Sequence, residues 1–270
     1  MTKTILFIHG MFQNSVSWRG WVSFFERHGF SCSAPSWPRH QGVPRELRLQ
    51  VPAGLGHLTL AEVVDEYERD CRGHGDKPIL IGHSVGGLVA QILAARGLAS
   101  AAVCISSVAP NDLIAADWHL MKNIADITNP LRGHSIYEMT PEAFHENFCN
   151  TLSAAESLAA YGATATHDSR QVLRDCLGPQ GWLNLAAPHV PLLFVGGGDD
   201  HIIPAALNRR NCEHYRDPGS VAEFIEFPGR GHFICGAPGW EEVAERALGW
   251  IESHVAVGAG AGGEQGWKPA

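Results

Sequence analysis

Residues 77–90 constrain the fold of this chain most, because an apolar run there ends in Gly-x-Ser-x-Gly and continues as a helical pattern. A strand that turns sharply into a helix at this motif presents the central serine, here Ser84, as a nucleophile. Such a tight turn crowds the backbone, so we expect Gly82 and Gly86 to stand where a Cβ would clash. The motif is short enough to arise by chance, and its meaning depends on its setting.

Strands and helices are expected to alternate along the first part of the chain. Apolar runs predict strands at 4–8, 30–34, 78–82 and 101–106. Amphipathic patterns predict helices at 14–28, at 60–71 after a Thr59-x-x-Glu62 capping box, and from the Ser84 turn to Arg96. The loop at 35–57 has no assignable pattern. The alternation indicates an α/β fold whose parallel sheet is covered by helices on both faces.

The alternation lapses for about eighty residues and then resumes. Only helical patterns occur in the gap, at 112–127, 141–151, 153–162 and 168–177. Further strands and helices are predicted at 190–195, 205–215, 222–227 and 240–254. We therefore expect one core made of residues 1–110 and 186–257, a helical cap or lid at 111–185 inserted before the penultimate strand, and a flexible Gly-rich tail at 258–270.

Composition excludes several classes of function. The formal net charge is −8 and no basic block occurs, which argues against nucleic acid or an anionic membrane surface as partner. The 15 histidines show no metal-binding spacing, and we expect no metal and no cofactor. The N-terminus leads into a short strand rather than a signal sequence, and the seven cysteines have no paired spacing. We therefore expect a cytoplasmic protein with reduced thiols.

Candidate catalytic groups follow four of the predicted strands. His9-Gly10 follows the first, Ser84 follows the strand at 78–82, Asp199-Asp200 follows the strand at 190–195, and His232 follows the strand at 222–227. Ligands of open α/β sheets bind at the carboxyl ends of the strands, where these groups would meet. The order Ser, Asp, His along the chain is typical of Gly-x-Ser-x-Gly nucleophile turns.

In the order and spacing of these motifs the sequence resembles the α/β-hydrolase superfamily over nearly all of residues 1–254. The resemblance implies an α/β-hydrolase fold with about six mainly parallel strands, because the usual N-terminal strand pair of the family is missing. The acid pattern of the family, Asp-x-(Ile/Val)-apolar-Pro, matches residues 200–204 and favours Asp200 over Asp199 as the catalytic acid. Both carboxylates remain candidates, because either could accept a hydrogen bond from a histidine.

The resemblance also assigns the remaining catalytic roles. His232 becomes the general base, and the backbone N–H groups of Met11 and Val85 become the oxyanion hole. A serine Oγ is a poor nucleophile at neutral pH, so Ser84 needs a base to take its proton and an acid to orient that base. We therefore expect a cofactor-independent serine hydrolase that cleaves a carboxylic ester, thioester or lactone through an acyl-enzyme on Ser84.

Other interpretations of these residues stay open. Ser84 could be an ordinary helix N-cap, and His232 a hydrogen-bonded core histidine. His201 competes with His232 as the base, although it directly follows the acid in an extended turn and should point away from it. Asp112 and Asp117 are further candidates for the acid. His9 is expected to stabilise the oxyanion loop by hydrogen bonding, and His83 to pack beside the nucleophile turn.

The insertion contains more large apolar residues than four short helices need in order to pack together. Some of them could line a pocket above Ser84, although docking of the cap onto the sheet would use the same residues. The pocket candidates, including one beside the base, are Trp118, Met121, Tyr137, Phe144, Phe148 and Phe233. The expected partner is a small apolar or aromatic ester-like substrate, and the sequence does not predict the oligomeric state.

Three alternative functions stay open beside ester cleavage. An amide or carbamate could replace the ester as the substrate. The same triad supports non-hydrolytic relatives, such as a lyase or a perhydrolase-like enzyme. A ligand receptor that retains the triad is the third alternative, and no segment of the sequence resembles a partner-binding tail.

Overall fold

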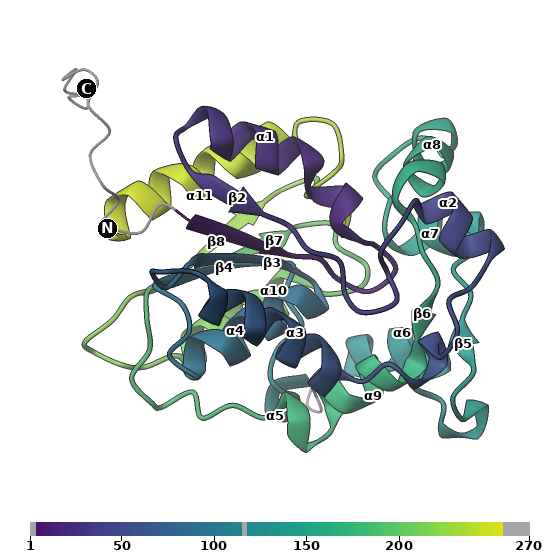
Figure 1. The fold of residues 1–270 in the computed structure, drawn as a ribbon, viewed down its shortest axis with the longest axis horizontal. Helices are drawn as coiled ribbons and strands as arrows, with labels where there is room; N and C mark the ends of the chain where they lie inside the picture. The colour runs from purple at the N-terminus through teal and green to yellow at the C-terminus, as the bar shows by residue number, and fades with distance from the viewer. Residues whose placement is uncertain (1–3, 115–117, 256–270) are drawn as a thin grey trace.

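A six-stranded sheet forms the centre of the computed structural model, which describes residues 4–114 and 118–255. The strand order is β2-β1-β3-β4-β7-β8, and every neighbouring pair is parallel (Figure 1). The strands are β1 (Thr4–Ile8), β2 (Ser31–Ser33), β3 (Ile79–His83), β4 (Ala101–Ile105), β7 (Leu192–Gly197) and β8 (Ala222–Phe227). The prediction of an α/β fold with about six parallel strands is confirmed.

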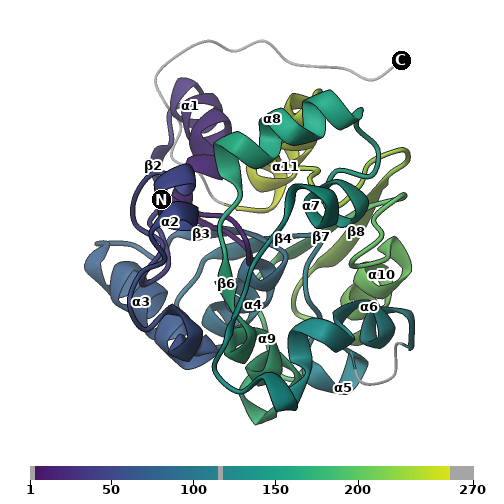
Figure 2. The same ribbon diagram turned by 90° about the vertical axis from the view of Figure 1, so that its right-hand side faces the viewer.

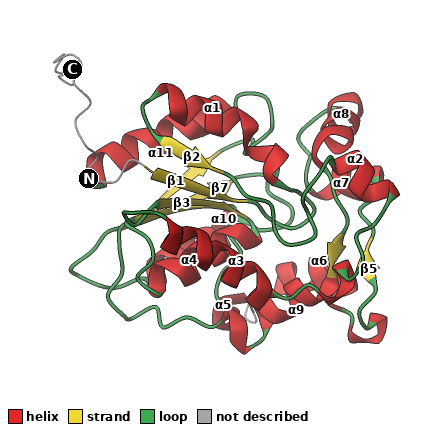
Figure 3. Ribbon diagram, viewed as in Figure 1, coloured by secondary structure: helices red, strands yellow, loops and turns green. Residues whose placement is uncertain are grey.

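Helices cover both faces of this sheet, as Figures 1 and 3 show. On one face lie α1 (Arg19–Arg27) and α11 (Trp240–His254); on the other lie α3 (Leu60–Gly73), α4 (Val85–Ala95) and α10 (Ala205–His214). Strand β1 shows why both faces are buried: Ile5 and Phe7 pack under α1, whereas Leu6 and Ile8 belong to the opposite core. Successive side chains of a strand point to opposite faces, so a sheet covered twice requires continuous apolar strands.

Local capping signals place several helix boundaries correctly. Thr59 and Glu62 form the predicted capping box at the start of α3, with the Glu62 N–H donating to Thr59 Oγ1 at 3.2 Å and the Thr59 N–H donating to Glu62 Oε2 at 3.0 Å. A second capping box, Ser153 with Glu156, begins α8 (Ala154–Thr164). Each box satisfies backbone donors that a helix N-terminus leaves unpaired.

The segment between β4 and β7, residues 111–185, is called the insert below. Its elements are α5 (Asn111–Ile114), α6 (Trp118–Thr128), β5 (Ile136–Tyr137), α7 (Pro141–Asn147), α8, β6 (Asp168–Ser169) and α9 (Arg170–Leu177), with short 3-10 turns at Pro130–Arg132 and Pro179–Gly181. The expectation of helices alone was wrong here, because β5 and β6 pair as a small antiparallel sheet. Two-residue strands are too short to show a period in the sequence.

Two helix boundaries in the insert also differ from the prediction. Residues 168 and 169 belong to β6, so the helix expected from 168 begins at Arg170. The helix expected over 112–127 is described as α5 and α6, and residues 115–117 lie outside the described part of the chain.

One further helix was not predicted. Helix α2 (Pro44–Leu49) interrupts the loop at 35–57, with Pro44 in its first turn. Figures 1 and 2 show α2 beside α8 of the insert, and there the Arg48 guanidinium lies 4.4 Å from the centre of the Tyr161 ring.

Among the described residues, no helix combines the length and apolar character needed to cross a bilayer.

Candidate active site

The parallel strands bring the sequence-predicted residues to one edge of the sheet. In β1 and β3, Ile8 is paired with Gly82, so the two loops that follow leave the sheet side by side. Strands β7 and β8 also run parallel, and Gly197 pairs with Phe227. Because all four strands end at the same edge, the chain places Met11, Ser84, Asp200 and His232 in one region.

Ser84 lies at a strained turn between β3 and α4. Its backbone has φ 57° and ψ −121°, a conformation that L-residues rarely adopt. The turn is held in place because the Ser84 N–H donates to the Ile105 carbonyl at 3.0 Å and the Ser84 carbonyl accepts from the Val108 N–H at 3.0 Å. Strain of this kind costs about 1–3 kcal/mol and persists only where the surroundings impose it.

The glycines of the motif allow the backbone to pass this close. A Cβ on Gly82 would lie 2.2 Å from the Gly86 carbonyl oxygen, and a Cβ on Gly86 would lie 2.2 Å from the Ile8 carbonyl oxygen. The expectation that both positions exclude a Cβ is confirmed. Gly10, in the loop after β1, also stands where a side chain would clash, since a Cβ added there would lie 2.7 Å from Ser84 Cβ.

Asp200 and His232 form a buried hydrogen-bonded pair. His232 Nδ1 donates to Asp200 Oδ2 at 2.8 Å, and both side chains are inaccessible to solvent. The other carboxylate oxygen, Oδ1, accepts from the Ile202 N–H at 2.9 Å and the Ile203 N–H at 2.8 Å. The carboxylate therefore has a fixed orientation, whereas Asp199 is exposed to solvent.

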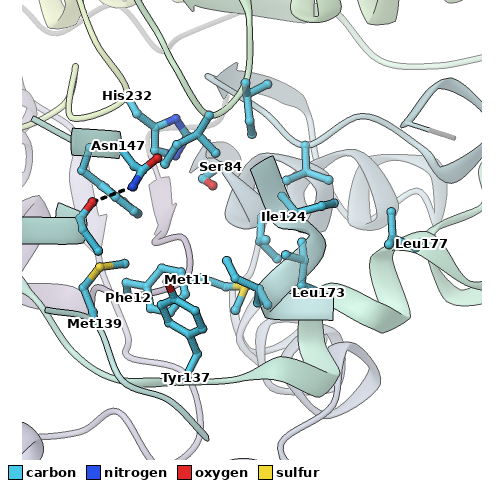
Figure 4. Close-up of a pocket in the computed structure, with 17 residues that line it drawn as sticks. Met11, Phe12, Ser84, Ile124, Tyr137, Met139, Asn147, Leu173, Leu177 and His232 are labelled. Atoms are coloured by element: carbon cyan, nitrogen blue, oxygen red, sulfur yellow. Dashed lines mark hydrogen bonds between the residues drawn. The ribbon is translucent and has the colours of Figure 1, made fainter. Parts of the chain in front are cut away.

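The ring and hydroxyl of the proposed base and nucleophile, His232 and Ser84, meet at the same cavity. Both side chains line one cavity (Figure 4), and His232 Nε2 makes no hydrogen bond to any part of the chain that the structure describes. The Asp200 bond fixes the proton on Nδ1 in the neutral ring, so Nε2 carries a free lone pair. The ring is held further by an edge contact with Phe148, at 4.9 Å between ring centres.

His83 supports this arrangement from behind. Its Nε2–H donates to the His232 carbonyl at 2.8 Å, and its ring centre lies 4.7 Å from that of His232. Burial, followed by the proximity of the His232 ring, lowers the pKa of His83 to about 3. His83 is therefore neutral at physiological pH and serves as a packing residue and hydrogen-bond donor, as expected.

His9 organises the loop after β1. Its Nδ1–H donates to the Gly10 carbonyl at 2.8 Å, and its Nε2 accepts from the Trp37 N–H at 2.9 Å. Burial is the main cause that lowers the pKa of His9 well below its usual value, and the neighbouring His40 adds to it. The neutral ring is the form that both bonds require. Met11 follows in this loop and, like Val85 beside Ser84, lines the cavity.

The cavity at Ser84 is apolar and partly enclosed by the insert. It contains about 760 Å³ of space, including its open mouth, which is within the range of small-molecule sites. Apart from Ser84 and His232, its polar side chains are Tyr137 and Asn147 (Figure 4). Its apolar lining is Met11, Phe12, Val85, Val108, Ile124, Ile127, Met139, Ala143, Phe148, Leu173, Leu177, Ile202 and Ile203.

The predicted pocket residues divide into three groups. Tyr137 and Phe148 line the cavity. Phe144 and Phe233 are buried but lie outside the lining, where their rings contact each other at 5.8 Å. Met121 is half-buried and packs against the core without lining the cavity. The side chain of Trp118 lies outside the part of the chain that the structure describes.

Sequence reasoning missed one polar residue of the cavity, Asn147. Its Nδ2 donates to the Ala143 carbonyl at 2.8 Å, which fixes the amide so that its oxygen points towards Ser84 and His232 (Figure 4). The helical pattern of 141–151 placed Asn147 within a helix, but no feature of the sequence showed which face that helix turns towards the cavity.

Neither His201 nor Asp112 belongs to the cavity at Ser84. His201 is exposed and does not line the cavity, and Asp112 is exposed on α5. Asp117 is among the residues that the structure does not describe. No group of three His, Cys, Asp or Glu side chains in the described ranges is arranged to hold a metal ion.

Comparison with known families identifies the fold family. The family model described as "Alpha/beta hydrolase family" matches residues 5–246. The chain belongs to the alpha/beta hydrolase family. No curated protein sequence matches it.

Solved structures of similar fold include three enzymes at low sequence identity. A monoacylglycerol lipase from Paleococcus ferrophilus has a TM-score of 0.69 and 20% identity, with 94% of this chain and 96% of the lipase covered. Tomato methylketone synthase I with 2-tridecanone has a TM-score of 0.69 and 16% identity, covering 94% and 99%. A pyrethroid hydrolase from Sphingobium faniae has a TM-score of 0.68 and 18% identity, covering 95% and 99%. At these identities the likeness shows the shared fold.

Proposed function

We propose that this alpha/beta hydrolase is a serine hydrolase that cleaves a carboxylic ester, thioester or lactone with an apolar portion. The observation that carries the proposal is the pairing of Asp200 with His232 opposite a strained Ser84 on one apolar cavity. Ser84 is the nucleophile, His232 the general base and Asp200 the acid that orients it. This geometry matches the roles of a Ser-His-Asp triad.

The mechanism follows from these positions. His232 Nε2 takes the Ser84 hydroxyl proton while Oγ attacks the substrate carbonyl carbon, and the backbone N–H groups of Met11 and Val85 stabilise the resulting oxyanion. The tetrahedral intermediate collapses, the C–O or C–S bond breaks, and His232 gives its proton to the leaving group. His232 then deprotonates a water that attacks the acyl-enzyme, and it returns this proton to Ser84 Oγ as the Oγ–acyl bond breaks and the acid leaves. Each oxyanion donor contributes on the order of 3 kcal/mol.

The cavity supports an apolar substrate. Its lining is almost entirely aliphatic and aromatic, and the insert acts as a cap that supplies one wall of it. The enzymes of similar fold include a monoacylglycerol lipase and a pyrethroid hydrolase, and methylketone synthase I was crystallised with 2-tridecanone, an apolar ketone. An amide or carbamate of the same shape would meet the same catalytic groups and is a variant of this proposal.

A fluorophosphonate probe tests the nucleophile. The proposal predicts covalent labelling of the purified protein and its loss in Ser84→Ala, with Ser153→Ala at the N-cap of α8 as the matched control that keeps labelling. Labelling that persists in Ser84→Ala would contradict the assignment.

Turnover of p-nitrophenyl esters from acetyl to dodecanoyl tests the substrate class. An apolar cavity predicts that kcat/KM rises beyond acetyl and passes through a maximum at a longer acyl chain. A preference for acetyl over all longer chains would contradict an apolar acyl site.

The second candidate is a non-hydrolytic reaction at the same site, which the fold likeness to methylketone synthase I favours. This alternative predicts slow ester turnover and binding of small ketones in the cavity. Measuring the acid released per fluorophosphonate-reactive site separates the two, because a hydrolase releases many equivalents and a non-hydrolytic relative does not.

A further inference from the structure

The two peptide planes beside Met11 are each held by a buried side chain. The first plane joins Gly10 to Met11, and the hydrogen bond from His9 Nδ1 to the Gly10 carbonyl fixes its tilt. The carbonyl and the next N–H share one plane and point in opposite directions. Holding the Gly10 carbonyl therefore also sets the direction of the Met11 N–H.

The second plane joins Met11 to Phe12 and is held by the insert. In this plane the Phe12 N–H donates to Asp168 Oδ2 at 2.9 Å. In the plane that follows, the Phe12 carbonyl accepts from the Thr166 N–H at 2.9 Å. Phe12 has a positive φ of 64°, which a residue with a Cβ adopts only where its surroundings impose it. Both backbone groups of this strained residue are thus bonded to residues from the strand β6 region.

Asp168 is a buried carboxylate whose own position is fixed. Its side chain has no solvent exposure, and Oδ1 accepts from the Ser169 N–H at 2.7 Å. His40 Nε2 lies 3.4 Å from Oδ2, an ion-pair distance without hydrogen-bond geometry. Burial is the largest influence on the pKa of His40 and lowers it, but the Asp168 carboxylate together with nearby backbone carbonyls, such as that of Pro38, leaves the pKa raised. A buried carboxylate without such partners would be strongly destabilising.

A short turn from Trp37 to His40 connects His9 and Asp168, the two side chains that bond the peptides beside Met11. The His40 N–H donates to the Trp37 carbonyl at 3.0 Å, and the Trp37 N–H donates to His9 at 2.9 Å. The rings of His9 and Trp37 stack at 4.8 Å between centres. His9 from the core and Asp168 from the insert are therefore parts of one buried network around the loop at Met11.

We infer that Asp168, although it belongs to the insert, is a positioning residue for the oxyanion hole and acts through the Phe12 N–H. The inference rests on the proposed function of Ser84 and Met11. Asp168 does not line the cavity and touches no reacting atom. Its loss would release the Phe12 N–H and let the backbone at Phe12 and Met11 shift, so that the Met11 N–H would point less accurately at the oxyanion.

The insert contains a matched control, Asp175. This carboxylate on α9 is also buried, and its Oδ2 accepts a backbone N–H of the core, that of Leu60 at 3.1 Å. Its Oδ1 accepts from Gln171 Nε2 at 2.7 Å. Asp175 thus makes the same kind of contact between insert and core at the start of α3, without touching the loop at Met11.

The experiment compares Asp168→Ala with Asp175→Ala in the full-length protein. We measure kcat and KM on the best p-nitrophenyl ester, Ki for an alkyl trifluoromethyl ketone of matched length, and Tm. Ser84 Oγ adds to the carbonyl carbon of the ketone, and the hydroxyl proton passes to His232. The ketone oxygen then becomes an oxyanion in the hole. Removing a full oxyanion donor costs about 10²–10³ in kcat, so a displaced donor should cost roughly tenfold to hundredfold.

The expected result is that Asp168→Ala lowers kcat and raises Ki by similar factors, while KM changes less than about threefold. Asp175→Ala should lower Tm without changing Ki. Asp168→Asn keeps an acceptor oxygen and should recover part of the kcat, which also provides a test if the alanine variant does not fold.

Two results would overturn the inference while leaving the proposed function intact. The first is that the wild-type protein turns over the ester and the Asp168 variants bind the ketone with the same Ki as the wild type. The other is an equal change of Ki in Asp175→Ala, which would show a general effect of loosening the insert. A wild-type protein that neither turns over the ester nor binds the ketone would instead contradict the proposed function.

Discussion

The sheet core and the insert contribute to the cavity in different ways. The core fixes the positions of individual polar groups. Ser84 lies on a strained turn, and the His232 ring is oriented by the 2.8 Å bond from its Nδ1 to Asp200. The insert mainly supplies surface, such as Phe148, Leu173 and Leu177 along the apolar wall. Atoms fixed by backbone geometry govern the rate of chemistry, whereas an apolar wall governs which substrate fits. Apart from Asp168, which bonds the core loop at Phe12, substitutions in the two regions should therefore change different kinetic constants.

The largest effect is expected at the proposed acid in the core. Asp200→Asn keeps the shape of the pair but removes the charge and favours the wrong histidine tautomer, so kcat should fall by about 10⁴. The exposed neighbour is the control, and Asp199→Asn should retain near-wild-type kcat. Steady-state kinetics on one ester decides between them. Loss of activity in the Asp199 variant alone would reverse the assignment.

A core glycine should show the next largest effect. Gly10→Ala places a methyl group 2.7 Å from Ser84 Cβ and 2.9 Å from the His83 carbonyl oxygen, so the loop or the nucleophile must shift. A displacement of about 1 Å near the reacting atoms can cost on the order of 10² in kcat/KM. Gly249→Ala on α11, whose Cβ meets no atom within 4 Å, is the matched control for kinetics and thermal unfolding. Unchanged kcat/KM in Gly10→Ala would argue against a tight turn at Ser84.

In the insert the expected effect is on selectivity. Leu177→Ala enlarges the wall of the cavity and should shift the preferred acyl chain to a longer one, changing the ratio of kcat/KM between long and short esters by roughly tenfold. The control is Leu158→Ala on the same insert, where the side chain is 59% exposed and lines no part of the cavity. The ester chain-length series measures both. A uniform loss across all chain lengths would contradict a role in selectivity.

The smallest effect concerns stability towards acid. Between the folded pKa of His83, about 3, and its usual value of 6.5, the unfolded chain binds a proton that the folded chain does not. The free energy of unfolding therefore falls as pH falls through this window, by up to about 1.4 kcal/mol per pH unit from this residue. His83→Gln keeps a donor for the His232 carbonyl and should lose less stability between pH 6.5 and 4.5. Urea unfolding at several pH values checks this, and equal slopes for both proteins would contradict it.

The core was predictable because its signals are local. The apolar run and the two glycines at Ser84 lie within a few residues of each other, and the strands at 4–8 and 222–227 have the predicted bounds. The proposed acid and base follow strand ends, where parallel topology gathers them without further information. The bond between His232 and Asp200 joins residues that the motifs had already singled out.

The insert was less predictable because its structure depends on contacts distant in the sequence. Strands β5 and β6 pair Ile136 with Ser169, and two residues cannot show a period. Amphipathic helices such as α7 bury Phe144 against Phe233 and turn Asn147 to the cavity, a choice that depends on what covers each face. Asp168 bonds Phe12 across 156 residues, and its own surroundings in the sequence give no sign of a buried role.

The bonds from Phe12 to Thr166 and Asp168 have a consequence for protein engineering. An insert between two sheet strands looks like a module that could be exchanged for another to change specificity. Here a replacement segment would need to supply a carboxylate oxygen that accepts from the Phe12 N–H and a backbone N–H that donates to the Phe12 carbonyl. Chimaeras that keep residues 166–169 while replacing the helices on either side should therefore tolerate recombination better than replacements of the whole segment.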